Sequence, residues 1–196
     1  DHTNTTTDTT DDETTSSTTQ DIHEGDLYLI GNEVVMDKLV DGNVFIIGNK
    51  VTITGQVNGN LYVLARQINF DGAIIRYSMF ICSGYMYLGT GGTYEGDAYI
   101  ACHTLNTTYN SYIARDIKVL SSNVSFKSAV GRDVDLLCKT LDLGSGSDIP
   151  MIYGDLNYKS NKEVSIPENI LAGDGTVTFS SNSTFNFSPY TLLTIF

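Results

Sequence analysis

Residues 41–57 read DGNVFIIGNKVTITGQV, and residues 58–74 read NGNLYVLARQINFDGAI. The two segments match at turn positions and at apolar positions, and this alignment places Val57 over Ile74. Counted from the third residue of each segment, an asparagine, the apolar residues fall at offsets of one, three, eight, ten and fourteen. Alternation with a period of two predicts short strands that bury one face.

The same pattern continues along the chain, with one anchor residue in each repeat. Strands of about five or six residues cannot hold themselves together and must stack on their counterparts in the next repeat. The steps between anchors vary from 17 to 22 residues, whereas a left-handed hexapeptide helix would hold every step to a multiple of six. The sequence therefore predicts an all-β fold, a single-stranded right-handed parallel β-helix (β-solenoid) of about nine coils. The anchors are Asp26, Asn43, Asn60, Ser78, Asp97, Asp116, Asp133, Asp155 and Asp174.

Composition divides the chain into three parts. Residues 1–20 hold ten threonines, five acidic residues and no aliphatic or aromatic residue, so they predict a disordered Thr-rich acidic tail. Residues 21–180 form the predicted β-helix domain. Residues 181–196 are aromatic and apolar around Pro189, which predicts either a carboxyl-terminal cap or the start of a membrane anchor.

Charge and motifs exclude several functions. The net charge of −12 disfavours nucleic acid and anionic membrane surfaces as partners. The chain contains no phosphate-binding loop and no GxSxG or SxxK motif, so we expect neither nucleotide use nor serine chemistry. The three cysteines lack CxxC spacing; Cys102 and Cys138 fall in a predicted column of small corner residues, and Cys82 is interpreted as an apolar strand end. We therefore expect no catalytic residues, no cofactor and no metal ion.

A row of aromatic residues is the first candidate site. At offset two, which predicts an outward position, five successive repeats carry an aromatic residue. Such a row stabilises a solenoid without any partner, but it is also a candidate surface for lateral assembly or for sugar stacking. The row consists of Tyr28, Phe45, Tyr62, Phe80 and Tyr99.

The two ends of the solenoid are the second candidate site. A solenoid without caps exposes strand edges and a slice of its core, which promotes self-association. No amphipathic helix that could serve as a cap precedes residue 21. The predicted end-coil interface consists of Leu27, Leu29, Phe179 and Phe185.

A cluster of charged residues in the second half of the chain supports a rival hypothesis. Asp116, Asp133 and Asp135, with Arg115 and Arg132, are candidates for a Ca²⁺ site or a lyase active site. The anchor positions are also explained structurally, because Asn and Asp side chains cap tight turns. His103 has no second histidine near it in the repeat pattern, which argues against a metal or general-base role.

Several segments resemble the bactofilin, or polymer-forming cytoskeletal, family and its membrane-associated relatives. They are GNVFIIGNKVTITGQVNGNLYVLA, GDAYIA, ARDIKVL, VGRDVDLL and IYGDLNY. The resemblance implies a right-handed β-helix that polymerises end to end without nucleotide, with no catalytic residues.

The resemblance leads to a functional expectation, which is a non-enzymatic scaffold of the bacterial cell envelope that self-assembles through its end coils or its aromatic face. The expected partners are further copies of the chain and, in addition, a membrane or the cell wall. The acidic Thr-rich tail favours an extracytoplasmic or cell-surface location, with or without a membrane anchor, over a cytoplasmic one. The alternative is a surface protein that binds polysaccharide or cleaves it as a lyase.

Overall fold

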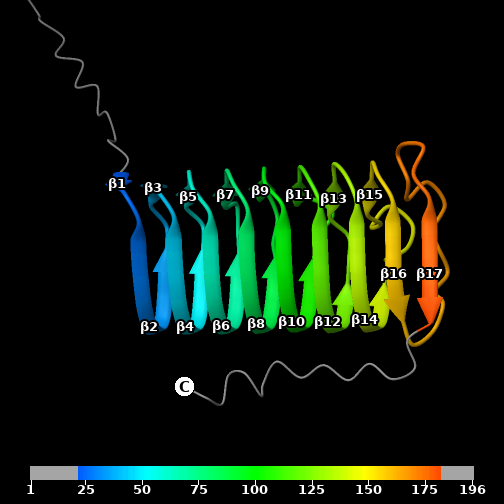
Figure 1. The fold of residues 1–196 in the computed structure, drawn as a ribbon, viewed down its shortest axis with the longest axis horizontal. Coiled ribbons are helices and arrows are strands. Elements are labelled where there is room, and N and C mark those ends of the chain that lie inside the picture. The colour runs from blue at the N-terminus through cyan, green and yellow to red at the C-terminus, as the bar shows by residue number, and fades with distance from the viewer. Residues whose placement is uncertain (1–21, 182–196) are drawn as a thin grey trace, which may run out of the picture.

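The protein is an all-β solenoid of about nine turns in the computed structural model, which describes residues 22–181 (Figure 1). These residues contain no helix, and every ladder between named strands is parallel, as the sequence predicted. The chain winds through two sheets, so that successive strands of each sheet come from successive coils. The predicted tail at residues 1–20 lies outside the described residues.

A nine-stranded sheet supplies the long strands of the solenoid. Each of its longer strands covers nine or ten residues and bends at a corner, so that it forms two sides of a coil. The strands are β2 (Leu27–Met36), β4 (Val44–Ile53), β6 (Leu61–Phe70), β8 (Met79–Leu88), β10 (Ala98–Thr107), β12 (Ile117–Ser125), β14 (Val134–Asp142), β16 (Leu156–Ser160) and β17 (Val177–Ser181).

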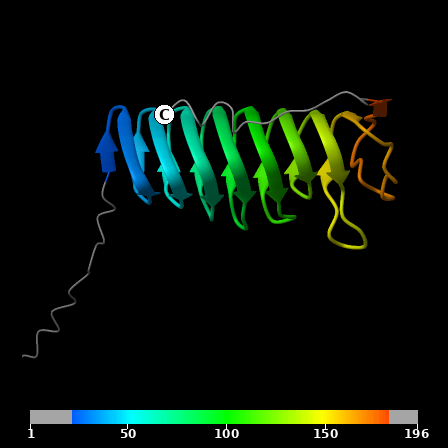
Figure 2. The same ribbon diagram turned by 90° about the horizontal axis from the view of Figure 1, so that it is seen from below.

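An eight-stranded sheet closes the remaining side of the coils with short strands (Figure 2). Most of them cover only two residues, of which the second is buried. They are β1 (Ile22–Glu24), β3 (Leu39–Asp41), β5 (Gln56–Val57), β7 (Ile74–Ile75), β9 (Thr93–Tyr94), β11 (Tyr112–Ile113), β13 (Ala129–Val130) and β15 (Met151–Ile152).

The register of the long strands confirms the predicted repeat alignment. Val44 pairs with Leu61 and Val51 pairs with Ile68, so that like positions stack directly on one another. The predicted column of small corner residues is also present, because Gly48, Ala65 and Ser83 occupy equivalent positions in three successive coils. Larger side chains at these positions would collide inside the turn.

Two positions of the predicted alignment are wrong. The inward residue of the third coil is Ile75, not Ile74, since Val57 pairs with Ile75. This coil contains one extra residue, which the turn before β7 accommodates. Near the end of the chain, Thr176 and not Asp174 takes the anchor position, because Leu156 pairs with Val177. The longer connection after β16 absorbs the difference.

A loop between β14 and β15 contains the extra residues of the longest repeat, in which the anchors Asp133 and Asp155 are 22 residues apart. Ser145 and Asp148 form an isolated antiparallel bridge across it, and Gly144 and Gly146 have φ angles of 73° and 62°. These angles lie in the left-handed region that glycine adopts without strain. In Figure 2 the loop projects from the side of the solenoid, so the extra residues leave the register of the strands unchanged.

The anchor column forms a hydrogen-bonded ladder between coils. The backbone N–H of Asn43 donates to Oδ1 of Asp26 at 2.8 Å, and the N–H of Asn60 donates to Oδ1 of Asn43 at 2.9 Å. The same contact joins the N–H of Asp155 to Oδ1 of Asp133 at 2.8 Å. The sequence predicted that these side chains cap turns; they do so across coils, each capping the turn of the next one.

We expect Asp133→Ala to lower the free energy of unfolding by about 1 kcal/mol, because it leaves the N–H of Asp155 without its acceptor. Asp133→Asn keeps an acceptor oxygen at the same position and serves as the matched control, with a change of less than about 0.5 kcal/mol. Urea denaturation followed by circular dichroism measures both values. Equal losses in the two variants would show that the carboxylate charge, and not the acceptor, is responsible.

Candidate functional site

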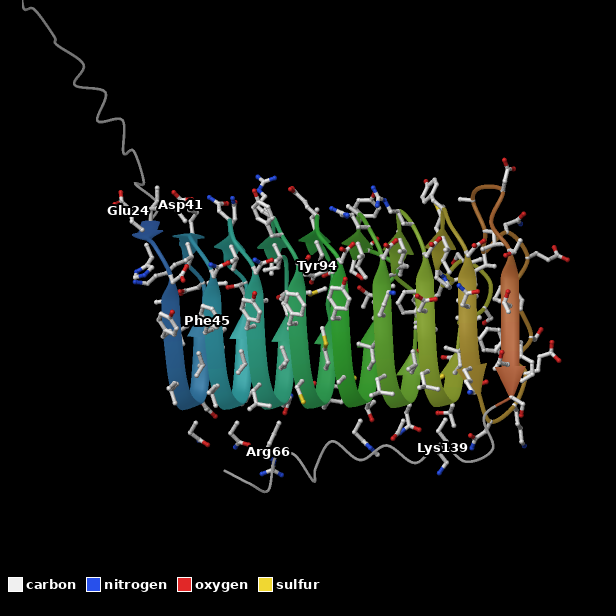
Figure 3. All side chains as sticks on the ribbon, in the orientation of Figure 1. Glu24, Asp41, Phe45, Arg66, Tyr94 and Lys139 are labelled. Carbon is white, nitrogen blue, oxygen red and sulfur yellow. The ribbon has the colours of Figure 1, made fainter. Side chains whose placement is uncertain are left out.

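The predicted aromatic row is present on the outer face of the nine-stranded sheet. Neighbouring ring centroids lie 4.9, 4.7, 5.1 and 5.1 Å apart along the row, and adjacent ring planes differ by at most 7°. Figure 3 shows Phe45 within this row. The parallel pairing of the strands brings Tyr28, Phe45, Tyr62, Phe80 and Tyr99 together, as predicted.

A second column of outward side chains flanks the aromatic row and was missed in the sequence. It lies at offset four, two residues after each ring, and it is aliphatic at most positions. Ile30 is 81% exposed and Ile47 is 46% exposed. The signal was available, because core residues at offsets one and three place both two and four on the outside. We call Ile30, Ile47, Leu64, Cys82, Ala101, Leu120 and Leu137 the aliphatic column.

The aromatic row and the aliphatic column together form an apolar strip along the solenoid. Between them runs an open groove of about 640 Å³, which extends from Phe45 and Ile47 on β4 to Leu137 on β14. The sole charged side chain among the residues that line it is that of Lys118, which follows Tyr99 in the row. Lys118 lies 3.7 Å from Asp135, so this end of the row is polar.

The orientation of the rings determines what the row can bind. The inner rings at these distances have both faces covered by their neighbours, and their edges point to solvent. The two end rings, Tyr28 and Tyr99, each stack on a neighbouring ring through one face only. Carbohydrate stacking uses the face of an aromatic ring, and within the row each inner ring has a neighbour on both faces. The geometry therefore favours an apolar contact surface over a sugar platform.

The predicted end-coil residues occupy the first and last coils of the described chain. Leu27 and Leu29 lie on β2 and are only partly buried against the core. Phe179 lies on β17, where its ring packs 5.2 Å from that of Tyr158. Phe185 lies outside the described residues. Neither β2 nor β17 has a second ladder partner within residues 22–181.

The three cysteines occupy two different environments. Cys102 and Cys138 are fully buried in the small corner column, and burial raises the pKa of the Cys102 thiol to about 12 and that of Cys138 to about 11. Both thiols therefore stay protonated at neutral pH. Cys82 faces outward in the aliphatic column and is half-buried in the groove, where partial burial also raises its pKa.

The charged cluster considered for catalysis or Ca²⁺ is largely accounted for by the fold. Oδ1 of Asp116 accepts the backbone N–H of Asp133 at 3.2 Å, and Asp133 in turn caps Asp155. Nε of Arg115 lies 3.2 Å from Oδ1 of Asp97, which compensates that carboxylate. Among residues 22–181, no three His, Cys, Asp or Glu side chains gather in a group that could hold a metal ion.

Corner residues lie apart from the apolar strip. Figure 3 shows Arg66 and Lys139 along one edge of the solenoid, and Glu24 and Asp41 along the opposite edge. His103 and Arg66 occupy equivalent positions in their coils, one residue after the small corner column, and His103 is partly buried. Within the described part of the chain, no helix is long and apolar enough to cross a membrane.

The fold and the surface define the protein as a β-solenoid with an apolar strip along one face. Comparisons with family models, with curated proteins and with solved structures find no match.

We expect the aromatic row to stabilise the fold. Tyr62→Ala removes two stacking contacts and should lower the free energy of unfolding by about 1–3 kcal/mol. Tyr77→Ala, at an exposed tyrosine outside the row, is the control and should cost less than about 0.5 kcal/mol. Thermal and urea unfolding of both variants measures the difference, and a Tyr62→Ala variant as stable as the control would refute a structural role.

Proposed function

We propose that the protein is a non-enzymatic scaffold of the bacterial cell envelope that self-assembles through its end coils. The proposal follows the resemblance of its repeats to the bactofilin family. The observation that carries it is the open edge of β2, a ten-residue strand that pairs only with β4 among the described residues.

The outer edge of β2 is well suited to pairing with another chain. Soluble proteins usually protect a long edge strand with lysine, proline or a bulge. The sequence of β2, LYLIGNEVVM, contains a single charged residue, Glu33, and no proline. Next to this edge, Leu27 and Leu29 leave part of the core uncovered, so a second coil would add both backbone hydrogen bonds and apolar burial.

The other end of the solenoid offers a smaller surface. β17 is a five-residue strand, and its ladder joins it only to β16 within the described residues. Phe179 contributes an apolar side chain that is partly buried against the core. Both ends therefore support association, and the longer β2 edge favours the amino-terminal end as the stronger contact.

The location in the envelope is supported by composition. Residues 1–20 are acidic and Thr-rich, which is typical of spacers outside the membrane of bacterial surface proteins. We therefore propose an extracytoplasmic or cell-surface location, and a cytoplasmic one as its alternative.

Polysaccharide binding or cleavage is the rival function. Its support is the aromatic row, although the rings present edges to solvent and their faces to one another. Binding of the chain to a glycan array, together with a thermal shift on adding Ca²⁺, would favour this rival over the scaffold.

Self-assembly through the amino-terminal coil predicts that Leu29→Lys lowers the average mass in solution. A lysine at this position places a charge beside the β2 edge, where association would bury it without a partner. Size-exclusion chromatography with light scattering over a range of protein concentrations measures the mass. Phe179→Lys tests the other end in the same way and should have the smaller effect.

The matched control for these variants is Thr52→Lys, which adds the same charge at an outward position of β4, a strand that is paired on both edges. It should leave the mass unchanged. Circular dichroism verifies that each variant retains its β structure. A strictly monomeric parent chain at high concentration, or equal loss of mass in the control, contradicts assembly through the end coils.

A further inference from the structure

The apolar strip leads directly to the point where the described chain ends. β17 is the last strand of the same sheet, and Ser180 continues the line of positions that holds the aliphatic column. A shallow surface lined by Leu137, Lys159 and Ser180 connects the groove with this end. The residues that follow Ser181 therefore start at one end of the strip.

Residues 182–196 have an uncharged, largely apolar composition that suits contact with the apolar strip. This fifteen-residue segment contains no Asp, Glu, Lys or Arg. Its first three residues, Asn-Ser-Thr, are polar, and large apolar side chains recur after them. These side chains are Phe185, Phe187, Tyr190, Leu192, Leu193, Ile195 and Phe196.

We propose that residues 182–196 fold back along the outer face of the nine-stranded sheet and occupy the groove of the apolar strip in the same chain. The segment covers the exposed edges of the aromatic row and the side chains of the aliphatic column. This docking is independent of self-assembly through the end coils, and it holds whether or not those coils associate.

The length of the segment fits the length of the strip. Neighbouring strands lie about 4.8 Å apart, so the seven steps from β17 to β4 cover roughly 34 Å. Fifteen extended residues reach about 50 Å. Phe185 comes four residues after Ser181, a reach of about 13 Å, whereas β14 lies two steps or roughly 10 Å away. The polar start therefore crosses the polar end of the strip, and the first ring arrives at Leu137.

A segment that binds to the face of the sheet contacts only side chains, whereas a segment that binds to its edge also forms backbone hydrogen bonds. The backbone groups of β6 and β8 are engaged in ladders with their neighbours on both sides. A segment interrupted by Pro189 would be a poor ladder strand, but it can cover an apolar face without hydrogen bonds to it. Burial of the aliphatic and aromatic side chains then supplies the driving force.

A second copy of the chain is the less favourable occupant. Two chains that met through their strips would lie side by side along several coils, which brings two bodies of net charge −12 each closer over a longer surface than an end-to-end contact does. The segment carries no charged side chain. The segment is also tethered beside the strip, and this linkage gives it a high effective concentration. The observations therefore favour docking within one chain.

Cys82 provides a reporter inside the groove, and the test measures its reaction with a maleimide. Cys102→Ser and Cys138→Ser leave Cys82 as the only thiol, and serine already occupies this buried corner column at Ser83 and Ser121. Phe187→Asp with Leu192→Asp removes two apolar contacts from the segment. Thr184→Asp with Thr191→Asp adds the same charge at polar positions of the segment and is the matched control.

We expect the Phe187→Asp and Leu192→Asp variant to raise the labelling rate of Cys82 by about tenfold, since the groove then opens. The control should react at a rate close to that of the parent chain, and neither rate should depend on protein concentration. Equal rates in all three proteins would overturn the proposal. A parent rate that falls as the protein concentration rises would also overturn it, because a second copy would then cover the groove.

Discussion

The in-register stacking of parallel coils is the constraint on which the rest of the structure depends. Each strand pairs with the equivalent strand of the next coil, so every side chain lies above a side chain from the same position in the repeat. A position tolerates only side chains that fit against their own kind: small residues at the corner, apolar residues inside, and hydrogen-bonding residues in the anchor column. Repetition of residue types along the sequence is therefore a condition for the stability of this fold.

The same stacking also generates the surface. A column that faces outward can accumulate like side chains, and here two adjacent columns are apolar over several coils. Each inner ring of the row stacks on a neighbour on both of its faces, which stabilises aromatic side chains on an outer face of the sheet. The aliphatic column beside the aromatic row gains no comparable ring stacking. Its exposed side chains are therefore a better indication than the rings that another segment or another molecule contacts this face.

The repeats in the sequence made the solenoid architecture predictable. Coils of unequal length and contacts between coils were harder to predict. The alignment of each repeat with the next was predicted correctly along the long strands, because both the apolar residues and the turn residues recur at the same positions, as at Asn43 and Asn60. The inward residue of the third coil was misplaced because an apolar pair, Ile74 and Ile75, fits either register. The groove was overlooked because the residues at offset four, such as Ile47 and Leu64, were not assigned to the outer face in the sequence. Partners of the anchor side chains lie in other coils, and a linear reading could not assign them.

The loop between β14 and β15 shows how this architecture absorbs additional sequence. Its residues leave the stack and return to it without shifting the next coil. Length added at such a position changes the circumference of one layer and leaves the rise per layer unchanged. The rod could thus acquire a new side module, by gene insertion or by design, while its axial dimension and the spacing of everything displayed along it stayed fixed.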